Sequence, residues 1–384
     1  MLTNQQKDFS LPKSITYLNG AYMSPLLKSV EKVGTEALVK KRNPTLISPE
    51  DFFTDSEKLR DEFAKLINSK ESTRIAIIPS VSYGMANVVK NISLERTQHV
   101  LVAAEQFPSN YYPWQRLCEE KGGEMKIIAP PQTREHRGKI WNERILENIT
   151  RQTKVVALGN VHWADGTLFD LRAIRKRTNE VGALLIIDGT QSVGALPFDV
   201  EKAQPDALIC AGYKWLLGPY SLGLAYYGEF FDGGKPVEEN WINRKNSENF
   251  SGLVNYESNY QPGALRYEVG EHSNFILVPM LLKALEQLNK WKPENIQAYC
   301  NSITKNTIDE LVELGFWIEE EGYRASHLFG IRLPGELELT KVKQELLKKK
   351  IYVSYRGDAI RISPNVYNTK EDLKKLSNTL TRSL

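Results

Sequence analysis

Short apolar runs alternate with amphipathic stretches between residues 74 and 228. Seven of these runs have the length and apolar character of buried strands, at 74–79, 99–104, 124–130, 154–159, 183–189, 206–212 and 222–228. Stretches with helical spacing separate most of them, for example 110–122 and 171–182. Near-continuous apolar strands that alternate with helices are typical of a mostly parallel sheet covered on both faces. We therefore predict an α/β fold with a large seven-stranded sheet.

The pattern changes after about residue 275. Two long helical patterns, at 276–292 and 295–313, are followed by short strands mixed with helices, at 327–334, 340–350, 352–356, 359–363 and from 370 onward. Such a mixture is typical of a small α+β domain. We predict a large domain over 1–275 and a small C-terminal domain over 276–384, with the segment 1–25 able to pack on the small domain.

The segment 229–274 lies between these two regions. It is rich in Gly, Asn, Glu and Tyr and has no clear period. Long irregular segments inside compact proteins are usually functional. We expect this one to line a site or a subunit contact.

Composition narrows the classes of partner. Lys and Arg number 50 and Asp and Glu 47, so the formal charge of +3 gives no electrostatic reason to expect nucleic acid or a membrane surface. The first residues carry no apolar leader, and no apolar run approaches the length of a membrane span. Cysteines occur at 118, 210 and 300 without paired spacing, which argues against a disulfide framework or a metal site. We expect a cytoplasmic protein.

Polar and aromatic residues follow several of the predicted strands. Ligands bind at the carboxyl ends of strands in parallel sheets, so these residues are candidates for one site. They are Ser80, Val81, Ser82, Phe107, Asn160 and His162. The Ser-Val-Ser sequence opens a predicted helix, where hydroxyls and free N–H groups suit a phosphate. Each signal has an ordinary alternative: a helix cap for the serines, a core position for the phenylalanine and a loop position for the histidine.

Two charged residues end apolar strands in the same region. Asp188 directly follows Leu-Leu-Ile-Ile, where a buried carboxylate needs a cationic partner. Lys214 follows the next strand, where burial would lower the pKa of its amine and make it nucleophilic. A phosphate site, an aromatic ring, an acid and an amine at one sheet edge form the set that pyridoxal phosphate (PLP) requires. The residues therefore predict a PLP enzyme.

The sequence resembles the class V aminotransferase family of fold-type I PLP enzymes, which includes cysteine desulfurases and kynureninases. The most specific part is Ile187-Asp188-Gly189-Thr190-Gln191-Ser192, followed by Ala211-Gly212-Tyr213-Lys214. The resemblance runs from Tyr17-Leu18-Asn19-Gly20-Ala21 to Arg361 and Tyr367-Asn368-Thr369. It implies a homodimer with active sites near the subunit interface.

The resemblance also implies residue roles. Lys214 would form the Schiff base with PLP, and Asp188 would pair with the ring nitrogen. Phe107 would stack on the ring, with Gln191 and Asn160 near its phenolic oxygen. The other implied positions are Ser80, Val81 and Ser82 at the phosphate, Tyr213 beside the phosphate or the Schiff base, Arg361 on the substrate α-carboxylate, and Asn19 and His162 at the substrate. The alternative for Arg361 is a surface position on a small-domain strand.

Two departures from the family pattern bear on function. The family often places Gly-Thr from the partner subunit at the phosphate, but this chain has Gly270-Glu271-His272, so only the backbone N–H of Gly270 is expected to contribute. Desulfurases carry a catalytic cysteine on a loop before the carboxylate arginine. The corresponding loop here, 354–359, is short and has no cysteine. Desulfurase chemistry is therefore disfavoured.

We expect an aminotransferase that acts on a small amino acid. The enzymes that remain as alternatives are a kynureninase-like hydrolase, a cysteine desulfurase-like or β-lyase-like enzyme, and an epimerase. A non-catalytic binding protein that retains the PLP fold is a further alternative, and the intact pair of Asp188 and Lys214 argues against it. The residue types at Phe107 and Tyr213 slightly favour the kynureninase-like alternative. The sequence does not support a nucleotide-binding function, because it contains neither G-x-G-x-x-G after a strand nor a P-loop motif.

Overall fold

Seven strands form one large sheet in the computed structural model, which describes residues 2–335 and 337–382. The strands lie in the spatial order β2, β8, β7, β6, β5, β3, β4. Their bounds are β2 (Ile75–Ile78), β3 (His99–Ala103), β4 (Glu124–Ile128), β5 (Thr153–Gly159), β6 (Leu184–Asp188), β7 (Ala207–Ala211) and β8 (Gly223–Tyr227). Strand β8 is antiparallel to β2 and β7, and the other neighbouring pairs are parallel. The predicted α/β fold with a seven-stranded, mostly parallel sheet is confirmed.

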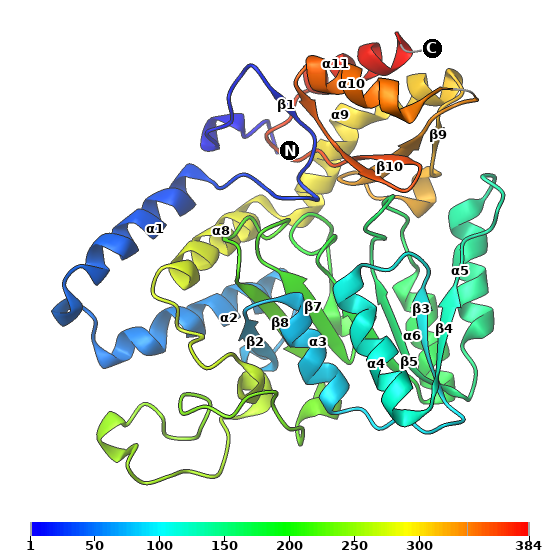
Figure 1. Cartoon of the computed structure of the whole chain (residues 1–384). Helices are drawn as coiled ribbons and strands as arrows, with labels where there is room; N and C mark the ends of the chain where they lie inside the picture. The colour runs from blue at the N-terminus through cyan, green and yellow to red at the C-terminus, as the bar shows by residue number, and fades with distance from the viewer. Residues whose placement is uncertain (1, 336, 383–384) are drawn as a thin grey trace.

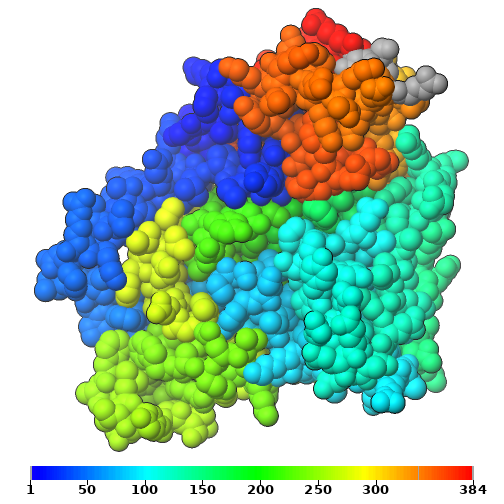
Figure 2. Space-filling view, in the orientation of Figure 1, coloured from blue at the N-terminus to red at the C-terminus, as the bar shows by residue number. Residues whose placement is uncertain are grey.

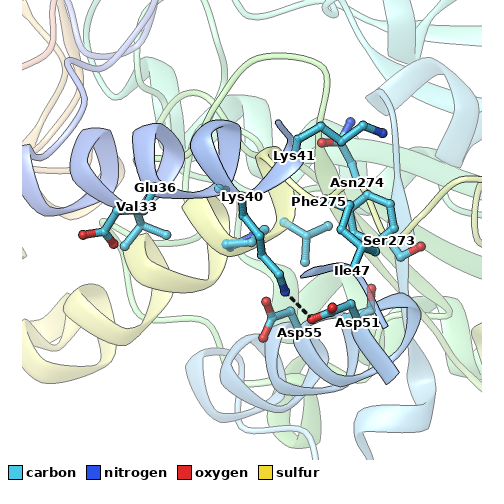
Figure 3. A pocket seen from close by; sticks show the side chains of 14 residues that line it. Val33, Glu36, Lys40, Lys41, Ile47, Asp51, Asp55, Ser273, Asn274 and Phe275 are labelled. Carbon is cyan, nitrogen blue, oxygen red and sulfur yellow. Dashed lines mark hydrogen bonds and ion pairs between the residues drawn. The ribbon is translucent and has the colours of Figure 1, made fainter. Parts of the chain in front are cut away.

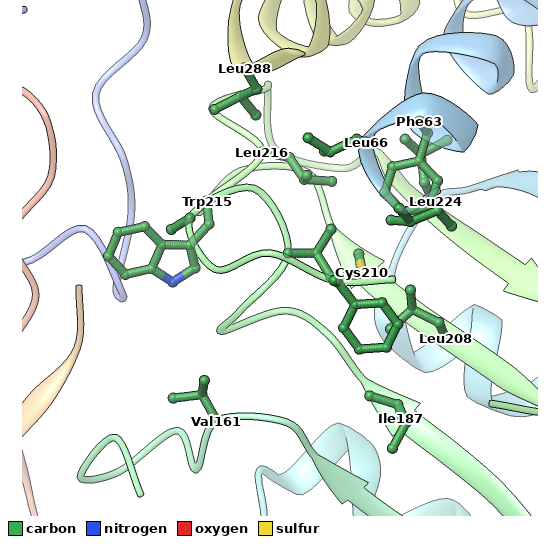
Figure 4. Packing of buried hydrophobic residues seen from close by; sticks show 14 of the residues in the cluster. Phe63, Leu66, Val161, Ile187, Leu208, Cys210, Trp215, Leu216, Leu224 and Leu288 are labelled. Atoms are coloured by element: carbon green, nitrogen blue, oxygen red, sulfur yellow. The ribbon is translucent and has the colours of Figure 1, made fainter. Parts of the chain in front are cut away.

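Helices cover both faces of this sheet (Figure 1). Successive strand residues point to opposite faces, so the strands contribute to two separate cores. One core contains Ile75 and Ile77 of β2 and the apolar sides of α2 (Thr54–Leu66), α5 (Arg137–Asn148), α6 (Leu171–Val181) and α8 (Leu277–Trp291). The other contains Ala76 and Ile78 with α3 (Val81–Lys90) and α4 (Tyr112–Lys121). Figure 4 shows side chains of the first core, among them Phe63 of α2, Leu224 of β8 and Leu288 of α8.

Local signals fix where the crossover helices begin and end. Asp170 caps α6 by accepting hydrogen bonds from the backbone N–H groups of Arg172 and Ala173 at 3.1 and 3.0 Å. The helix ends at Gly182, whose φ of 75° is a left-handed conformation that glycine adopts at little cost. Helix α4 ends at Gly122 in the same way. These short connections return the chain to the sheet and place every parallel strand end at one edge.

The last part of the chain forms a smaller α+β unit, as the sequence pattern predicts. Its four-stranded antiparallel sheet has the order β12, β13, β10, β9. Three helices pack with this sheet around a third core. The bounds are α9 (Pro293–Glu313), β9 (Trp317–Ile318), β10 (Phe329–Arg332), α10 (Leu339–Lys348), β11 (Ile351–Tyr352), β12 (Ser354–Arg356), β13 (Ala359–Ile362) and α11 (Lys370–Thr381). Figure 2 shows this unit seated on the large domain.

The N-terminal segment lies against the small domain. Strand β1 (Thr16–Tyr17) pairs in parallel with β11, with Thr16 opposite Ile351. The side chain of Asn4 donates hydrogen bonds to the Tyr299 hydroxyl at 2.9 Å and to the Asn368 carbonyl at 2.8 Å. The chain then crosses to the large domain through α1 (Lys28–Lys41), which packs on α8.

Helix α8 packs with the large domain. Its buried residues Leu281, Leu285 and Leu288 belong to the same core as Leu59 and Phe63 of α2. The same core also contains Ile296 and Cys300 of α9. The domain boundary between 275 and 276 therefore stays a prediction.

The segment 229–274 is irregular, as its composition predicts. It contains the short 3-10 turns η6 (Glu229–Phe231), η7 (Phe250–Gly252) and η8 (Gly263–Tyr267) and extends from the body of the molecule at the lower left of Figure 1. The α-helix not yet described is α7 (Val200–Ala203), between β6 and β7. Across 2–335 and 337–382, no helix has both the length and the apolarity that a membrane crossing needs.

Candidate active site

A cavity of about 250 Å³ lies at the carboxyl ends of the parallel strands. Strands β2, β3, β6 and β7 each contribute the residues that follow them, and the start of β8 closes one side. The cavity brings together most of the predicted cofactor residues, namely Ser80, Val81, Ser82, Phe107, Asp188, Gln191, Tyr213 and Lys214. One edge of one sheet therefore gathers residues that lie more than 130 positions apart in the chain.

The N-terminus of α3 forms one end of the cavity. Ser80 caps the helix, and its hydroxyl accepts a hydrogen bond from the Tyr83 N–H at 3.2 Å. The Ser82 hydroxyl donates to the Ser109 hydroxyl at 3.1 Å. The first N–H groups of a helix have no intrahelical acceptor, and the helix dipole adds partial positive charge there. This end is suited to a phosphate group.

Lys214 lies on the opposite side, just after β7. Its side chain is 6% exposed, and its Nζ lies 5.3 Å from the centre of the Phe107 ring and 5.5 Å from that of Tyr213. Burial lowers the pKa of the amine from 10.5 to about 8, although the nearby Asp188 acts in the opposite direction. The charges of Arg361 and Arg356 lower it further. The amine is therefore far easier to deprotonate than an ordinary lysine.

Asp188 ends β6 beside this amine. Burial raises the pKa of its carboxyl, and hydrogen bonds from Thr190 counteract the rise. One of these bonds runs from the Thr190 N–H to Asp188 Oδ1 at 3.0 Å. The Thr190 hydroxyl in turn accepts from the Ala211 N–H at 3.2 Å, which ties the two strand ends together. A cationic ring N–H placed at this carboxyl would favour its charged form.

Gln191 lines the cavity, but its amide is also bonded within the protein. Nε2 donates to the Ala21 carbonyl at 3.1 Å, and Oε1 accepts from the Trp215 indole at 2.9 Å. These bonds join the N-terminal segment to the loop that carries Lys214. Asn160 follows β5 directly and is buried outside the lining of this cavity, with its carbonyl accepting from the Phe169 N–H.

A second cavity of about 340 Å³ adjoins the first and shares Phe107, Trp163, Tyr213, Lys214 and Tyr220 with it. Arg361 and Arg356 of the small domain also line it.

Arg361 is only 1% exposed and lacks a carboxylate partner among the described residues. Its Nη1 donates to the Trp163 carbonyl at 2.7 Å, while Nε and Nη2 are buried without a hydrogen-bond acceptor. Burial, together with the charge of Arg356, lowers the pKa of this guanidinium to about 9. Buried donors without acceptors are costly. A carboxylate bound in the cavity would accept hydrogen bonds from both of these Arg361 nitrogen atoms, Nε and Nη2.

Besides Asn160, three predicted site residues lie outside the two cavities. Asn19 is buried under the small domain, where its Oδ1 accepts from the Ser354 hydroxyl at 2.6 Å. His162 is buried with Asp165 Oδ1 3.2 Å from Nδ1 and the Ala104 carbonyl 3.1 Å from Nε2, so protein oxygens occupy both ring nitrogens. The Gly270 N–H donates to the Glu238 carboxylate within the same chain. None of the three lines either cavity.

The structure adds residues that were not among the predicted set. Trp163, next to His162, contributes its ring to both cavities and contacts Phe107 edge-to-face with 5.3 Å between ring centres. Thr190 orients Asp188, and Arg356 faces the cavity from the same hairpin as Arg361. The aromatic character of the segment after β5 is the sequence feature from which the position of Trp163 could have been predicted. Which of its side chains turns inward depends on the fold.

A separate cavity of about 250 Å³ lies between α1, the start of α2 and Phe275 (Figure 3). It is crossed by an ion pair between Lys40 and Asp51 at 2.7 Å. It contains no residue of the set at the sheet edge. The candidate active site therefore consists of the two adjoining cavities at the sheet edge.

Comparison with known proteins agrees with this geometry. Residues 48–376 match the family described as Aminotransferase class-V. The chain belongs to this family. It is 28% identical over 325 residues to the uncharacterized aminotransferase YcbU of Bacillus subtilis, covering 83% of this chain and 81% of that protein. Enzymes of this family use PLP, and the chain is accordingly a PLP-dependent enzyme.

Its fold is also similar to those of solved structures. The cysteine desulfurase CsdA from Escherichia coli aligns with a TM-score of 0.80 at 19% identity, over 98% of this chain and 97% of that one. The cystine C–S lyase C-DES, in complex with cysteine persulfide, aligns with a TM-score of 0.84 at 18% identity, over 96% and 97%. At these identities the similarity defines a fold-type I architecture.

Proposed function

We propose that this class V enzyme transfers the amino group of a small amino acid to a keto acid. The observation that carries the proposal is the pairing of two groups in adjoining cavities. Lys214 supplies a buried amine of lowered pKa, and Arg361 supplies a buried guanidinium with two unsatisfied donors. An amine and a carboxylate receptor that line one cavity suit the two charged groups that all α-amino acids share.

The residues present fit PLP. The open N-terminus of α3 suits the phosphate, Asp188 suits the protonated ring nitrogen, Phe107 can cover the ring and Lys214 can hold the cofactor covalently. When bound, PLP supplies an electron-accepting ring that stabilises the charge released at the substrate Cα. Asp188 would hold a proton at the ring nitrogen of bound PLP. The Lys214 amine would take the substrate Cα proton and return it.

The reaction type is tested by incubating the PLP-loaded enzyme with single amino acids and a panel of keto acids. We expect a new amino acid that corresponds to the keto acid, detected by chromatography and mass spectrometry. Release of alanine with a side-chain fragment would instead favour a hydrolase or lyase. Exchange of the Cα proton with inversion, measured in deuterated water without a keto acid, would favour an epimerase.

A desulfurase or lyase is the second candidate, because solved enzymes of both kinds share this fold. A desulfurase passes sulfur to an exposed, activated thiolate. Cys118, Cys210 and Cys300 are all buried, and burial raises the pKa of each thiol. None of them lines either active-site cavity.

Removing the cysteines is therefore expected to leave turnover within about twofold of wild type, because the three buried side chains lie outside both active-site cavities and their replacement acts mainly on stability. The variant combines Cys118→Ser, Cys210→Ala and Cys300→Ser, and its turnover is compared with wild type after both are matched for bound PLP. Thermal unfolding of the same samples separates loss of fold from loss of chemistry. Loss of turnover in a folded, PLP-loaded single variant would restore the desulfurase hypothesis.

The rate of PLP capture should depend on pH through Lys214. Below its pKa the amine is protonated and cannot attack, so capture by the apoenzyme should accelerate as pH rises, with a midpoint near 8 rather than at the ordinary 10.5. Stopped-flow absorbance of added PLP measures this rate, and lysine with a blocked α-amine under the same conditions gives the reference. A midpoint for the protein that coincides with that of the blocked lysine would contradict the lowered pKa.

We also propose that the enzyme works as a homodimer in the cytoplasm. Exposed apolar side chains occur on α1, just after it and in the 229–274 segment, all at the left of Figure 1; they include Leu38, Val39, Leu46, Val254 and Tyr256. Such exposed groups are typical of protein–protein contacts. The free state of all three buried cysteines suits a reducing compartment. Light scattering of the PLP-loaded protein tests the dimer.

A further inference from the structure

The hairpin of β12 and β13 presents two arginines on one face. Ser354 pairs with Arg361 and Arg356 pairs with Ala359. Side chains alternate along a strand, so Arg356 shares a face with Ser354, and Arg361 shares that face from the opposite strand. The two arginines are therefore diagonal neighbours, a spacing within reach of long side chains. Both line the 340 Å³ cavity next to Lys214.

This cavity is cationic and lacks an acid. Among the described residues, its lining contains Lys214, Arg356 and Arg361 and no aspartate or glutamate. Arg356 donates from Nη1 to the Tyr355 carbonyl at 2.6 Å, and its Nε is buried without an acceptor. Like charges at neighbouring positions repel each other. An arrangement of this kind is stabilised when anions enter it.

Both guanidiniums are held in place before any ligand arrives. Their Cζ atoms lie 5.1 Å (Arg356) and 5.9 Å (Arg361) from the centre of the Trp163 ring, a cation–π arrangement. The Trp163 indole is fixed by its N–H, which donates to the Glu105 carbonyl at 2.5 Å.

The hairpin itself is anchored at two points. Ser354 bonds to Asn19, and Asp358 in the turn accepts from Arg332 Nε at 2.9 Å. A receptor ordered in advance does not have to be ordered by its ligand.

We propose that Arg356 binds a second carboxylate, at the end of the substrate side chain, so that the preferred substrate is a dicarboxylic amino acid. A single α-carboxylate has two oxygens, and one guanidinium edge satisfies both in a bidentate pair. Arg361 suffices for that role, which leaves the donors of Arg356 for another anion. This inference rests on the proposed function, since it takes Arg361 as the α-carboxylate receptor.

Unreactive carboxylic acids test the inference without any chemistry at the cofactor. Propionate carries one carboxylate, and succinate and glutarate carry two at different separations. Their affinities for the PLP-loaded wild type, Arg356→Gln and Arg361→Gln proteins are measured by isothermal titration calorimetry at fixed pH and ionic strength. Arg172→Gln, which removes an exposed arginine from α6, controls for the change in net charge.

We expect at least one diacid to bind wild type more tightly than propionate. Arg356→Gln should reduce diacid affinity about tenfold or more, the effect of losing hydrogen bonds between charged groups, and leave propionate unchanged. Arg361→Gln should weaken all three acids, and Arg172→Gln none. Arg356→Lys, which keeps the charge without the planar fork, should fall between wild type and Arg356→Gln for the diacids.

Two results would overturn the inference. Equal weakening of propionate and the diacids by Arg356→Gln would mean that both arginines share one carboxylate. Diacids that bind wild type no better than propionate would mean that no second anion site exists. Failure of the proposed function itself is recognised separately, because such a protein would not attach PLP to Lys214 or would not exchange amino groups with any keto acid.

Discussion

Borohydride reduction of the PLP-loaded protein is expected to attach the cofactor permanently to Lys214. This amine lies in the cavity with the open end of α3, and burial brings its pKa to about 8. Lys176, by contrast, is exposed on α6 and lies outside this cavity. Peptide mapping by mass spectrometry after reduction identifies the modified residue. Attachment to a different lysine, with Lys214 unmodified, would contradict the assignment.

Replacing Lys214 by Ala should have the largest effect on turnover. The chain loses both the covalent attachment point and the base that moves the Cα proton, and a positioned acid or base contributes about 10²–10⁴-fold. PLP should still bind noncovalently, because Asp188 and the N-terminus of α3 remain. Turnover is measured with saturating PLP, and Lys176→Ala on α6 is the matched control. Wild-type turnover in Lys214→Ala would exclude Lys214 as the catalytic amine.

The strands and the sheet edge could be predicted because their signals are local. Each buried strand is an apolar run, and the polar residues that follow it must lie at the edge where that strand ends. Asp188 and Lys214 were found in this way, since the fold needs only to place β6 beside β7 to bring them together. The side of the sheet on which each helix packs was not needed for that step.

The positions of Asn19, His162 and Gly270 depend on contacts between distant segments. The His162 ring meets the Ala104 carbonyl, which lies 58 positions away, and the Gly270 N–H meets Glu238, 32 positions away. No periodic pattern encodes such pairs. The loop after β5 was identified as part of the site, but its inward ring belongs to Trp163 and not to His162.

The layer that covers helix α8 also depends on contacts between distant segments. Helix α8 has a strong apolar stripe, and the sequence shows that the stripe is buried but not which layer buries it. The contacts with α1 and α2 decide the matter. The burial of Arg361 was also invisible, because it arises from docking the small-domain hairpin onto Trp163 of the large domain.

Arg361→Gln is expected to keep bound PLP and lose substrate affinity. The substitution removes two buried donors without acceptors from a residue that lines the cavity, and hydrogen bonds to a charged group contribute about 1.5–3 kcal/mol, or about 10–150-fold in affinity. All α-amino acids should be affected, because the carboxylate is common to them. Arg361→Lys should recover only part of the loss, since an ammonium cannot form the bidentate pair.

The dependence of initial rate on amino-acid concentration, together with PLP content from absorbance, separates a binding defect from a loss of cofactor. Arg172→Gln serves again as the exposed control. Normal substrate dependence in Arg361→Gln would place the carboxylate receptor elsewhere. Arg244 is a weak substitute, because it is already paired with Glu239 and lies outside both active-site cavities. Arg356 would then be the receptor, and the second-carboxylate inference would fail with Arg361.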